Sequence, residues 1–217
     1  TPINCRPFEW GADIIIHSTT KYMDGHATNV GGVIVDSGNF DWDAHADKFP
    51  GLTTPDESYH GLTYTKKFGK GAYITKATAQ VMRDLGSIQS PQNAFLLNLG
   101  LETLHPRMPQ HCKNAQKVAE YLHDNEKVAW VNYCGLKDNK YYELGQKYLP
   151  NGSCGVVTIG LTCGRDVYIN FMDNLKLAAI VTPLADDHPS VWPPTTPTHP
   201  QLPDNQLTHG GLHPLST

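Results

Sequence analysis

Short apolar runs alternate along the chain with segments in which apolar residues recur at helical spacing. Residues 12–18 (ADIIIHS) and 30–36 (VGGVIVD) are rich in β-branched residues, which favours strands. The first run is apolar on both faces, a pattern typical of a strand buried within a parallel sheet. Strand-like patterns also cover residues 128–133, 155–161 and 177–185.

Helical spacing predicts helices between these strands. They cover residues 71–86, a segment that opens at Ser90-Pro91, residues 114–125 and residues 165–175. Gly86 is expected to cap the first helix, because glycine adopts a left-handed backbone conformation without strain. The alternation of strands and helices predicts an α/β or α+β layer structure.

Composition and charge narrow the class of partner. The chain has 217 residues, 39% of them hydrophobic, which indicates a globular protein with a real core. The net charge of −4 provides no strong field for nucleic acid or an anionic membrane. We therefore expect a small-molecule or protein partner, no nucleic acid and no membrane association.

The cysteines and histidines do not suggest a metal site. The five cysteines are odd in number, and no two have a C-x-x-C spacing. A reducing cytoplasm fits this pattern better than a disulfide framework. The histidines of the Pro-rich tail lack the spacing of metal ligands. We predict a cytoplasmic protein without a bound metal.

Candidate chemistry follows the first apolar run, in the segment HSTTKYMDGHATNVGG (17–32). Ligands of open parallel sheets bind at the carboxyl ends of the strands, which is where Ser18, Thr20 and Lys21 stand. Ser18 and Thr20 are two positions apart and would share a face, so both hydroxyls suit one phosphate group. Lys21 is a candidate amine nucleophile for an aldehyde. Together they suggest pyridoxal phosphate (PLP), but on these residues alone a polar strand cap is the simpler interpretation.

Longer segments carry a resemblance to a known family. Residues 11–36 (GADIIIHSTTKYMDGHATNVGGVIVD) are similar to the cofactor-lysine segment of the Cys/Met-metabolism family of PLP-dependent enzymes. Residues 49–104 resemble its O-acetylhomoserine sulfhydrylase branch, including the long loop TTPDESYHGLTY (53–64). The similarity continues through NAQKVAEYL, KVAWVNYCGL and FMDNLKLAAIVT to about residue 185.

The resemblance implies an α/β fold of the fold-type I PLP-dependent transferase kind. Residues 1–105 would form the second, C-terminal half of the large parallel-sheet domain that binds PLP. Residues 106–217 would form a smaller C-terminal α/β domain with an irregular Pro-rich tail. The chain starts at Thr1 and enters a strand almost at once, so we expect a fragment that lacks the N-terminal part.

The resemblance also implies roles for single residues. Lys21 would form the Schiff base with PLP and then act as general base and acid, while Ser18 and Thr20 would contact the phosphate. Tyr22 would have a packing role, and Ser190 would lie near the substrate carboxylate. The implied reaction is γ-replacement on O-acetyl-L-homoserine, in which sulfide or a thiol displaces acetate to give homocysteine or methionine. A homo-oligomer, or association with the missing N-terminal part, is expected.

Departures from the family pattern leave alternatives open. The ring-stacking tyrosine, the glycine-containing phosphate loop and the aspartate at the pyridine nitrogen lie upstream in relatives, and the carboxylate-binding arginine near their end has no counterpart. The chain is therefore either a γ-replacement enzyme, a γ-lyase or cystathionine γ-synthase, or a catalytically incomplete fragment with a binding or structural role. Pro106 and Pro109 are expected to break a helix that relatives continue. Unexplained substitutions are Asp24, where glycine is common, and Pro183, Pro197 and Pro200.

Overall fold

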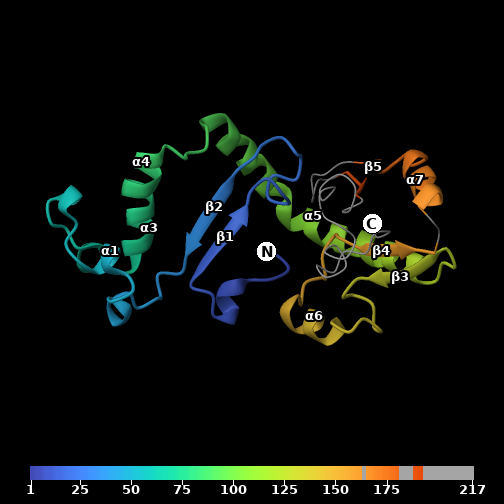
Figure 1. Ribbon diagram of the computed structural model, residues 1–217, viewed down its shortest axis with the longest axis horizontal. Coiled ribbons are helices and arrows are strands. Elements are labelled where there is room, and N and C mark those ends of the chain that lie inside the picture. The colour runs from blue at the N-terminus through green and yellow to red at the C-terminus, as the bar shows by residue number, and fades with distance from the viewer. Residues whose placement is uncertain (163–164, 181–187, 193–217) are drawn as a thin grey trace. The chain divides into compact units, whose positions relative to one another are not determined.

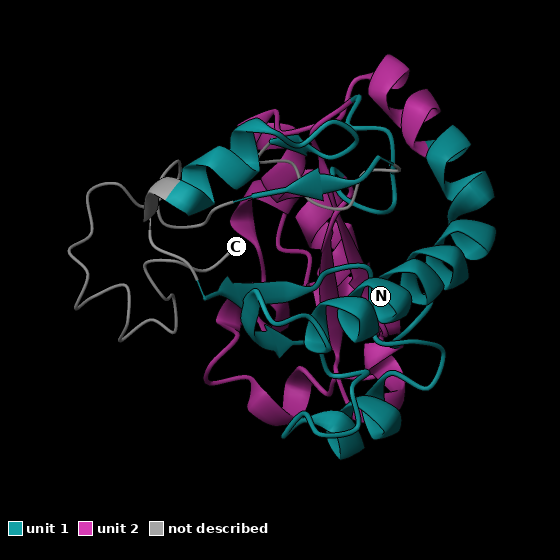
Figure 2. Ribbon diagram, turned by 90° about the vertical axis from the view of Figure 1, so that its right-hand side faces the viewer, with its two compact units in different colours: residues 1–5, 20–28, 98–217 teal, residues 6–19, 29–97 magenta. Residues whose placement is uncertain are grey.

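A computed structural model describes residues 1–162, 165–180 and 188–192 of the chain (Figure 1). The chain divides into two compact units (Figure 2). Unit 1 comprises Thr1–Cys5, Thr20–Thr28 and Asn98–Thr217, and unit 2 comprises Arg6–Thr19 and Asn29–Leu97. The boundary between a large and a small domain at residues 105 and 106 stays a prediction.

Unit 2 contains a two-stranded sheet followed by a series of short helices. The elements are η1 (Pro7–Trp10), β1 (Ile14–Ser18), β2 (Gly32–Asp36), η2 (Asp43–His45), α1 (Pro50–Thr53), η3 (Glu57–Tyr59), α2 (Tyr64–Phe68), η4 (Gly69–Gly71), α3 (Ala72–Lys76), the π-helix η5 (Ala77–Met82) and α4 (Arg83–Leu85). The predicted helix over residues 71–86 is confirmed. Gly86 follows α4 in the left-handed conformation, with φ of 71°.

The expectation that residues 12–18 form a strand buried within a parallel sheet differs from what this chain shows. β1 pairs with β2 antiparallel, from Ile14 opposite Asp36 to Ser18 opposite Gly32. The connecting segment 19–31 contains no helix, whereas a parallel crossover usually needs one. Ile16 is 74% exposed, so within this chain one apolar face of β1 is uncovered. An apolar pattern shows that a strand suits burial, but not which element covers it.

Aromatic side chains hold the helical part of unit 2 together. Its core consists of Trp42, Leu52, Tyr64 and Ala72, all buried. The Trp42 ring stacks on the ring of Tyr73 with centroids 5.6 Å apart and planes at 9°. This packing connects the loop after β2 to α3 and gives the short helices a common core.

Unit 1 is built along a long helix. α5 (Pro91–His123) begins in unit 2 and continues through unit 1, followed by β3 (Val128–Asn132), α6 (Tyr142–Tyr148), β4 (Thr158–Leu161), α7 (Arg165–Asp173), β5 (Ala179–Ile180) and β6 (Ser190–Val191). β3 pairs with β4 antiparallel, and β5 pairs with β6 parallel. The predicted strand at 128–133 and helix at 165–175 are confirmed. The strand predicted at 155–161 begins only at Thr158.

Some predictions fall outside the described residues. Of the strand predicted at 177–185, the structure describes Ala179–Ile180 as β5, and residues 181–185 lie outside the described ranges. Pro183, Pro197 and Pro200 lie outside them as well.

The predicted break at Pro106 and Pro109 is wrong, because α5 runs through both prolines. An interior proline removes a backbone hydrogen bond and costs about 3 kcal/mol. The face formed by Leu104, Met108 and Cys112 is buried at four-residue spacing, whereas both prolines lie on the exposed side. Burial of this face offsets the local cost, so packing determines the helix where propensity opposes it.

The core of unit 1 connects α5 to the β3–β4 sheet. Ala115 and Ala119 of α5 form a buried cluster with Tyr133 and Leu136. The Tyr133 hydroxyl donates a hydrogen bond of 3.0 Å to the backbone carbonyl of Cys154. Among the described residues, no helix is both long and apolar enough to cross a membrane.

Candidate functional site

The end of β1 places the first candidate side chains. Ser18 is the last residue of the strand and is exposed, opposite Gly32 of β2. Thr19 follows within unit 2, and its backbone N–H donates to the Gly31 carbonyl at 3.0 Å. This hydrogen bond extends the ladder by one step beyond β1. The loop that begins at Thr20 therefore follows a strand end that is held by a backbone hydrogen bond.

Glycine at position 31 is required by the side chain of Thr19. A Cβ on Gly31 would lie 2.7 Å from Thr19 Oγ1 and 3.3 Å from Gln89 Nε2. Thr19 is fully buried, and its Oγ1 has no hydrogen-bond partner among the described residues. Sequence reasoning did not single out Thr19, because it considered only the face of the strand that Ser18 and Thr20 share.

Lys21 lies in a loop of unit 1 that is closed on itself. The Lys21 carbonyl accepts a hydrogen bond of 2.9 Å from the backbone N–H of Gly25, whose φ of 73° is in the left-handed region that glycine tolerates. Thr20 and Lys21 are both half-buried. The lysine therefore projects from a tight turn rather than from a free coil.

The buried carboxylate of Asp24 organises the rest of this loop. Asp24 is 1% exposed, and it accepts hydrogen bonds of 2.9 Å from both the backbone N–H and the hydroxyl of Thr28. The backbone N–H of His26 donates to the same carboxylate at 3.4 Å. The sequence offered no account of Asp24. The structure shows an acceptor that ties residues 24–28 together, and the four-residue spacing to Thr28 was the available signal.

Helix α5 packs directly on the lysine loop within unit 1. A Cβ on Gly100 would overlap the backbone carbonyl oxygens of Met23 and Asp24, so only glycine permits this approach. The Arg107 guanidinium lies against Gly25 and donates from Nη2 to the Gly100 carbonyl at 2.8 Å. A glycine inside a helical pattern costs about 1 kcal/mol relative to alanine, so its presence there indicates that the helix packs closely on another element. Sequence reasoning did not use this signal.

Tyr22 has the packing role that the resemblance implied. Its ring lies 5.3 Å from the ring of His111, and its hydroxyl lies close to Gly155. Burial raises the pKa of Tyr22 to about 12, the thiol of Cys154 acts in the same direction, and a hydrogen bond from the Gly155 backbone opposes the shift. A phenol that stays protonated beside a loop anchors that loop and does not act as a base near neutral pH.

Ser190 lies in β6, the short strand that pairs with β5 in unit 1. Its side chain is half-buried. The backbone N–H of Ala179 donates to the Pro189 carbonyl at 3.2 Å beside it. Its role near a substrate carboxylate stays a prediction, as do the roles of Ser18, Thr20 and Lys21.

The residues present fit the two reactive ends of PLP. The amine of Lys21 suits its aldehyde, and the hydroxyls of Ser18 and Thr20 suit its phosphate. The hydrogen bonds of Asp24 and of the Lys21 carbonyl hold the backbone of the loop from which the lysine side chain extends. Among the described residues, no group of three or more His, Cys, Asp or Glu side chains is placed to hold a metal ion.

Comparisons with known proteins agree with this chemistry. The sequence pattern of the family described as Cys/Met metabolism PLP-dependent enzyme matches residues 1–214. The fold is that of a PLP-dependent enzyme of fold type I. The chain belongs to the Cys/Met-metabolism family of PLP-dependent enzymes.

Two curated relatives show which members of the family this chain is similar to. The chain is 42% identical to a homocysteine synthase of Schizosaccharomyces pombe, over 95% of this chain and 48% of that protein. It is 39% identical to an O-acetyl-L-homoserine sulfhydrylase of Leptospira meyeri, over 99% of this chain and 50% of that protein. The chain therefore spans about half the length of the curated relatives it matches.

Solved structures show the same relationship. A protein of Campylobacter jejuni described as an O-acetylhomoserine (thiol)-lyase, with pyridoxyl-lysine phosphate at its position 205, superimposes with a TM-score of 0.90 at 32% identity. The match covers all of this chain and 51% of that one. A cystathionine γ-synthase of Xanthomonas oryzae superimposes with a TM-score of 0.75 at 25% identity, over all of this chain and 47% of the other.

Proposed function

We propose that this chain carries the cofactor-binding lysine of an enzyme that replaces the γ-substituent of O-acetyl-L-homoserine. Sulfide or a thiol is the incoming nucleophile, and the products are homocysteine or methionine plus acetate. The observation that carries the proposal is Lys21, which follows Ser18 and Thr20 at the end of β1 in a chain 42% identical to a homocysteine synthase.

In this proposal the residues of the chain have separate tasks. Lys21 holds the cofactor covalently and then moves protons at its Nζ, while the hydroxyls of Ser18 and Thr20 orient the phosphate. Ser190 binds the substrate carboxylate. When bound, PLP supplies an electron sink that permits a leaving group to depart from the γ-carbon. Asp24, Gly100 and Arg107 keep the lysine loop in one conformation.

The proposal includes the cellular location and the oligomeric state of the enzyme. We expect a cytoplasmic homo-oligomer whose active site needs the polypeptide that the relatives have in addition to the region matched here. A γ-lyase or a cystathionine γ-synthase is the alternative within the same chemistry. The first is distinguished by release of α-ketobutyrate from homocysteine, the second by formation of cystathionine when cysteine replaces sulfide.

Covalent cofactor attachment tests the proposal. The chain is incubated with PLP, reduced with borohydride, digested and analysed by mass spectrometry. The expected result is a phosphopyridoxyl group on the peptide that contains Lys21, with loss of that adduct in Lys21→Ala. Lys113→Ala changes an exposed lysine of α5 and should leave the adduct intact. Labelling spread over many lysines, and equal in both variants, would overturn the assignment of Lys21.

Turnover tests the reaction. The chain, supplied with the complementary part of a relative, is given O-acetyl-L-homoserine with and without sulfide. Acetate release that depends on sulfide and on Lys21 supports γ-replacement. Sulfide-independent formation of α-ketobutyrate would instead assign a lyase.

A further inference from the structure

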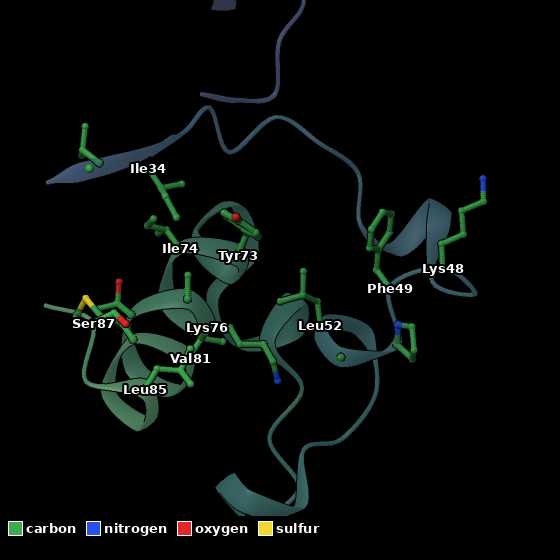
Figure 3. Close-up of a pocket in the computed structure, with 17 residues that line it drawn as sticks. Ile34, Lys48, Phe49, Leu52, Tyr73, Ile74, Lys76, Val81, Leu85 and Ser87 are labelled. Atoms are coloured by element: carbon green, nitrogen blue, oxygen red, sulfur yellow. The ribbon is translucent and has the colours of Figure 1, made fainter. Parts of the chain in front are cut away.

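The apolar groove of unit 2, between β2, α1 and the stretch from α3 to α4, is lined mainly by aliphatic and aromatic side chains. In Figure 3 Ile34 of β2 faces the side of α3 that carries Tyr73 and Ile74. The ammonium group of Lys76 at this groove is paired with the Asp56 carboxylate at 2.8 Å. The groove therefore has little chemistry to offer, whereas a reactive pair of residues stands in unit 1, in the turn after α6.

This turn contains the one Asn-Gly pair of the sequence, Asn151-Gly152. An asparagine side chain loses ammonia, a reaction called deamidation, when the backbone nitrogen of the next residue attacks its Cγ. Glycine hinders that attack least, because it has no side chain and its backbone is the most adaptable. Asn151 is exposed, so water reaches its side chain.

The amide of Asn151 holds the first residues of unit 1. Its Nδ2 donates a hydrogen bond of 2.9 Å to the backbone carbonyl of Ile3. The next residue, Asn4, is buried, and its Nδ2 donates to the Sγ of Cys112 in α5 at 3.0 Å. A carboxylate at position 151 could not donate to Ile3, because an ionised carboxyl group only accepts hydrogen bonds.

Glycine follows Asn151 for two structural reasons. The φ angle of Gly152 is 126°, in a region that L side chains rarely adopt. A Cβ at this position would also lie 2.8 Å from the Sγ of Cys112. The fold therefore requires an amide and a glycine at adjacent positions, and together they form the reactive pair.

A single backbone hydrogen bond restrains the attacking nitrogen. The N–H of Gly152 donates to the Leu149 carbonyl at 3.1 Å, and this bond has to break before the nitrogen reaches the Cγ of Asn151. Exposed turns with few buried contacts open at low free-energy cost. Deamidation should therefore proceed in the folded chain, but more slowly than in a free peptide of the same sequence.

We propose that Asn151 is a deamidation site whose conversion releases residues 1–5 from the turn after α6. The Gly152 nitrogen bonds to the Cγ of Asn151, the Cγ–Nδ2 bond breaks, and ammonia leaves with the proton of that nitrogen. Water then opens the cyclic imide at either carbonyl carbon and gives aspartate or isoaspartate, so water is the only co-reactant. Either product places a carboxylate beside the Ile3 carbonyl, where two acceptors repel each other.

Ageing of the full chain tests the reaction. The protein is kept in mildly alkaline buffer made with water enriched in heavy oxygen, then digested and analysed by mass spectrometry. We expect heavy oxygen to enter position 151 sooner than Asn39 or Asn174, which are also exposed but precede bulky residues. Asn151→Gln should stay unmodified, because its longer side chain would have to close a six-membered imide, which forms far more slowly. Lys21→Ala should age at the rate of the parent chain, so the test does not depend on cofactor attachment.

The thiol of Cys112 reports the release of residues 1–5. It is 8% exposed and accepts the hydrogen bond of Asn4, so an alkylating reagent reaches it only when this segment opens. Asn151→Asp should raise the alkylation rate of Cys112 about fivefold, since a net hydrogen bond is worth about 1 kcal/mol. In the aged parent chain the rate should rise with the fraction converted. Asn39→Asp is the matched control in unit 2 and should leave the rate unchanged, and circular dichroism verifies that both variants fold.

Two results would overturn the proposal. One is conversion of Asn151 in the folded chain that is no faster than conversion of Asn39. The other is an alkylation rate of Cys112 that is the same in Asn151→Asp, in Asn39→Asp and in the parent chain.

Discussion

Gly100 of α5 lies so close to the backbone carbonyl of Asp24 that a side-chain Cβ at this position would overlap the carbonyl oxygen. The loop that presents Lys21 is therefore set directly on the helix. Gly100→Ala forces the two apart, and overpacking of this kind costs about 1–3 kcal/mol. We expect a loss of that size in the unfolding free energy by urea denaturation, together with less phosphopyridoxyl adduct on Lys21.

Gly51 in α1 provides the control for this substitution. A Cβ at Gly51 would meet the Cε of Lys76 at 3.8 Å, an ordinary contact. Gly51→Ala should leave the unfolding free energy within about 1 kcal/mol of the parent or raise it. If Gly100→Ala were as stable as Gly51→Ala, the close approach of α5 to the loop would not be a feature of the folded protein.

The carboxylate of Asp24 should contribute more to the free energy of unfolding than is usual for a residue in a loop. Asp24→Ala removes the acceptor for both groups of Thr28 and should cost about 2–3 kcal/mol, since hydrogen bonds to a charged acceptor are stronger than neutral ones. Asp41→Ala removes an exposed acceptor, which takes one bond of 3.0 Å from Ala44, and should cost about 1 kcal/mol or less.

A double-mutant cycle separates the Asp24–Thr28 contact from other effects of the substitution. Thr28→Val removes the hydroxyl and keeps the shape of the side chain. We expect a coupling free energy of about 1 kcal/mol between Asp24→Ala and Thr28→Val in thermal or urea unfolding. Strict additivity of the two substitutions would show that the carboxylate acts elsewhere.

The buried hydroxyl of Thr19 predicts a stabilising substitution. Its Oγ1 has no partner among the described residues, and burying an unpaired hydroxyl costs about 1–3 kcal/mol. Thr19→Val should therefore raise the melting temperature by a few degrees, about 2–4 °C per kcal/mol for a chain of this length. A fall in melting temperature would reveal a hydrogen bond to Oγ1 in the native protein. Ser37→Ala, whose hydroxyl accepts a bond from Asn39, is the control and should be neutral or slightly destabilising.

Local sequence patterns predicted most elements that depend on local chemistry. The apolar runs predicted as strands correspond to β1, β2 and β3. Gly86 was predicted to cap a helix because glycine tolerates a left-handed backbone, and it follows α4 with a positive φ. The hydroxyls and the lysine that follow an apolar strand made residues 17–32 a candidate site, although on these residues alone a polar strand cap was the simpler interpretation. The assignment to a family depended on longer segments.

Features that depend on contacts distant in sequence were not predicted. The packing of Gly100 on Asp24 joins residues far apart along the chain, and no spacing rule connects them. The direction of β2 depends on how the segment 19–31 reverses the chain, which an apolar pattern does not encode. The continuity of α5 is determined by the buried face that Leu104 and Met108 share, whereas reasoning from propensity considered only the prolines.

The prolines of α5 provide a direct test of that balance. Pro106 and Pro109 lie in the interior of the helix and are exposed, so each costs a backbone hydrogen bond without contributing to the core. Pro106→Ala and Pro109→Ala should each stabilise the chain, by up to about 3 kcal/mol in urea unfolding. Pro55→Ala, in a loop, is the comparison and should be neutral or destabilising. A loss of stability on replacing Pro106 or Pro109 would indicate that the helix ends between them.

The ion pair of Asp56 and Lys76 predicts how the stability of unit 2 depends on pH. Asp56 accepts hydrogen bonds from Lys76 and from Ser58. They hold the pKa of Asp56 at about 2, below its ordinary value of 3.8. A depressed carboxyl pKa contributes stability that is fully present above the unfolded-state pKa and is lost as the pH falls through the folded-state value. The unfolding free energy of the parent chain should therefore contain a component that disappears between about pH 4 and pH 2.

Asp56→Asn isolates this component, because asparagine cannot ionise. The variant should be less stable than the parent chain near pH 6, and the difference should shrink towards zero near pH 2, when measured by urea unfolding at each pH. Lys76→Met removes the cation instead and should move the acid limb of the parent profile to higher pH. A destabilisation by Asp56→Asn that is the same at both ends of this range would mean that the carboxylate acts through its shape and the turn at Ser58 rather than through its charge.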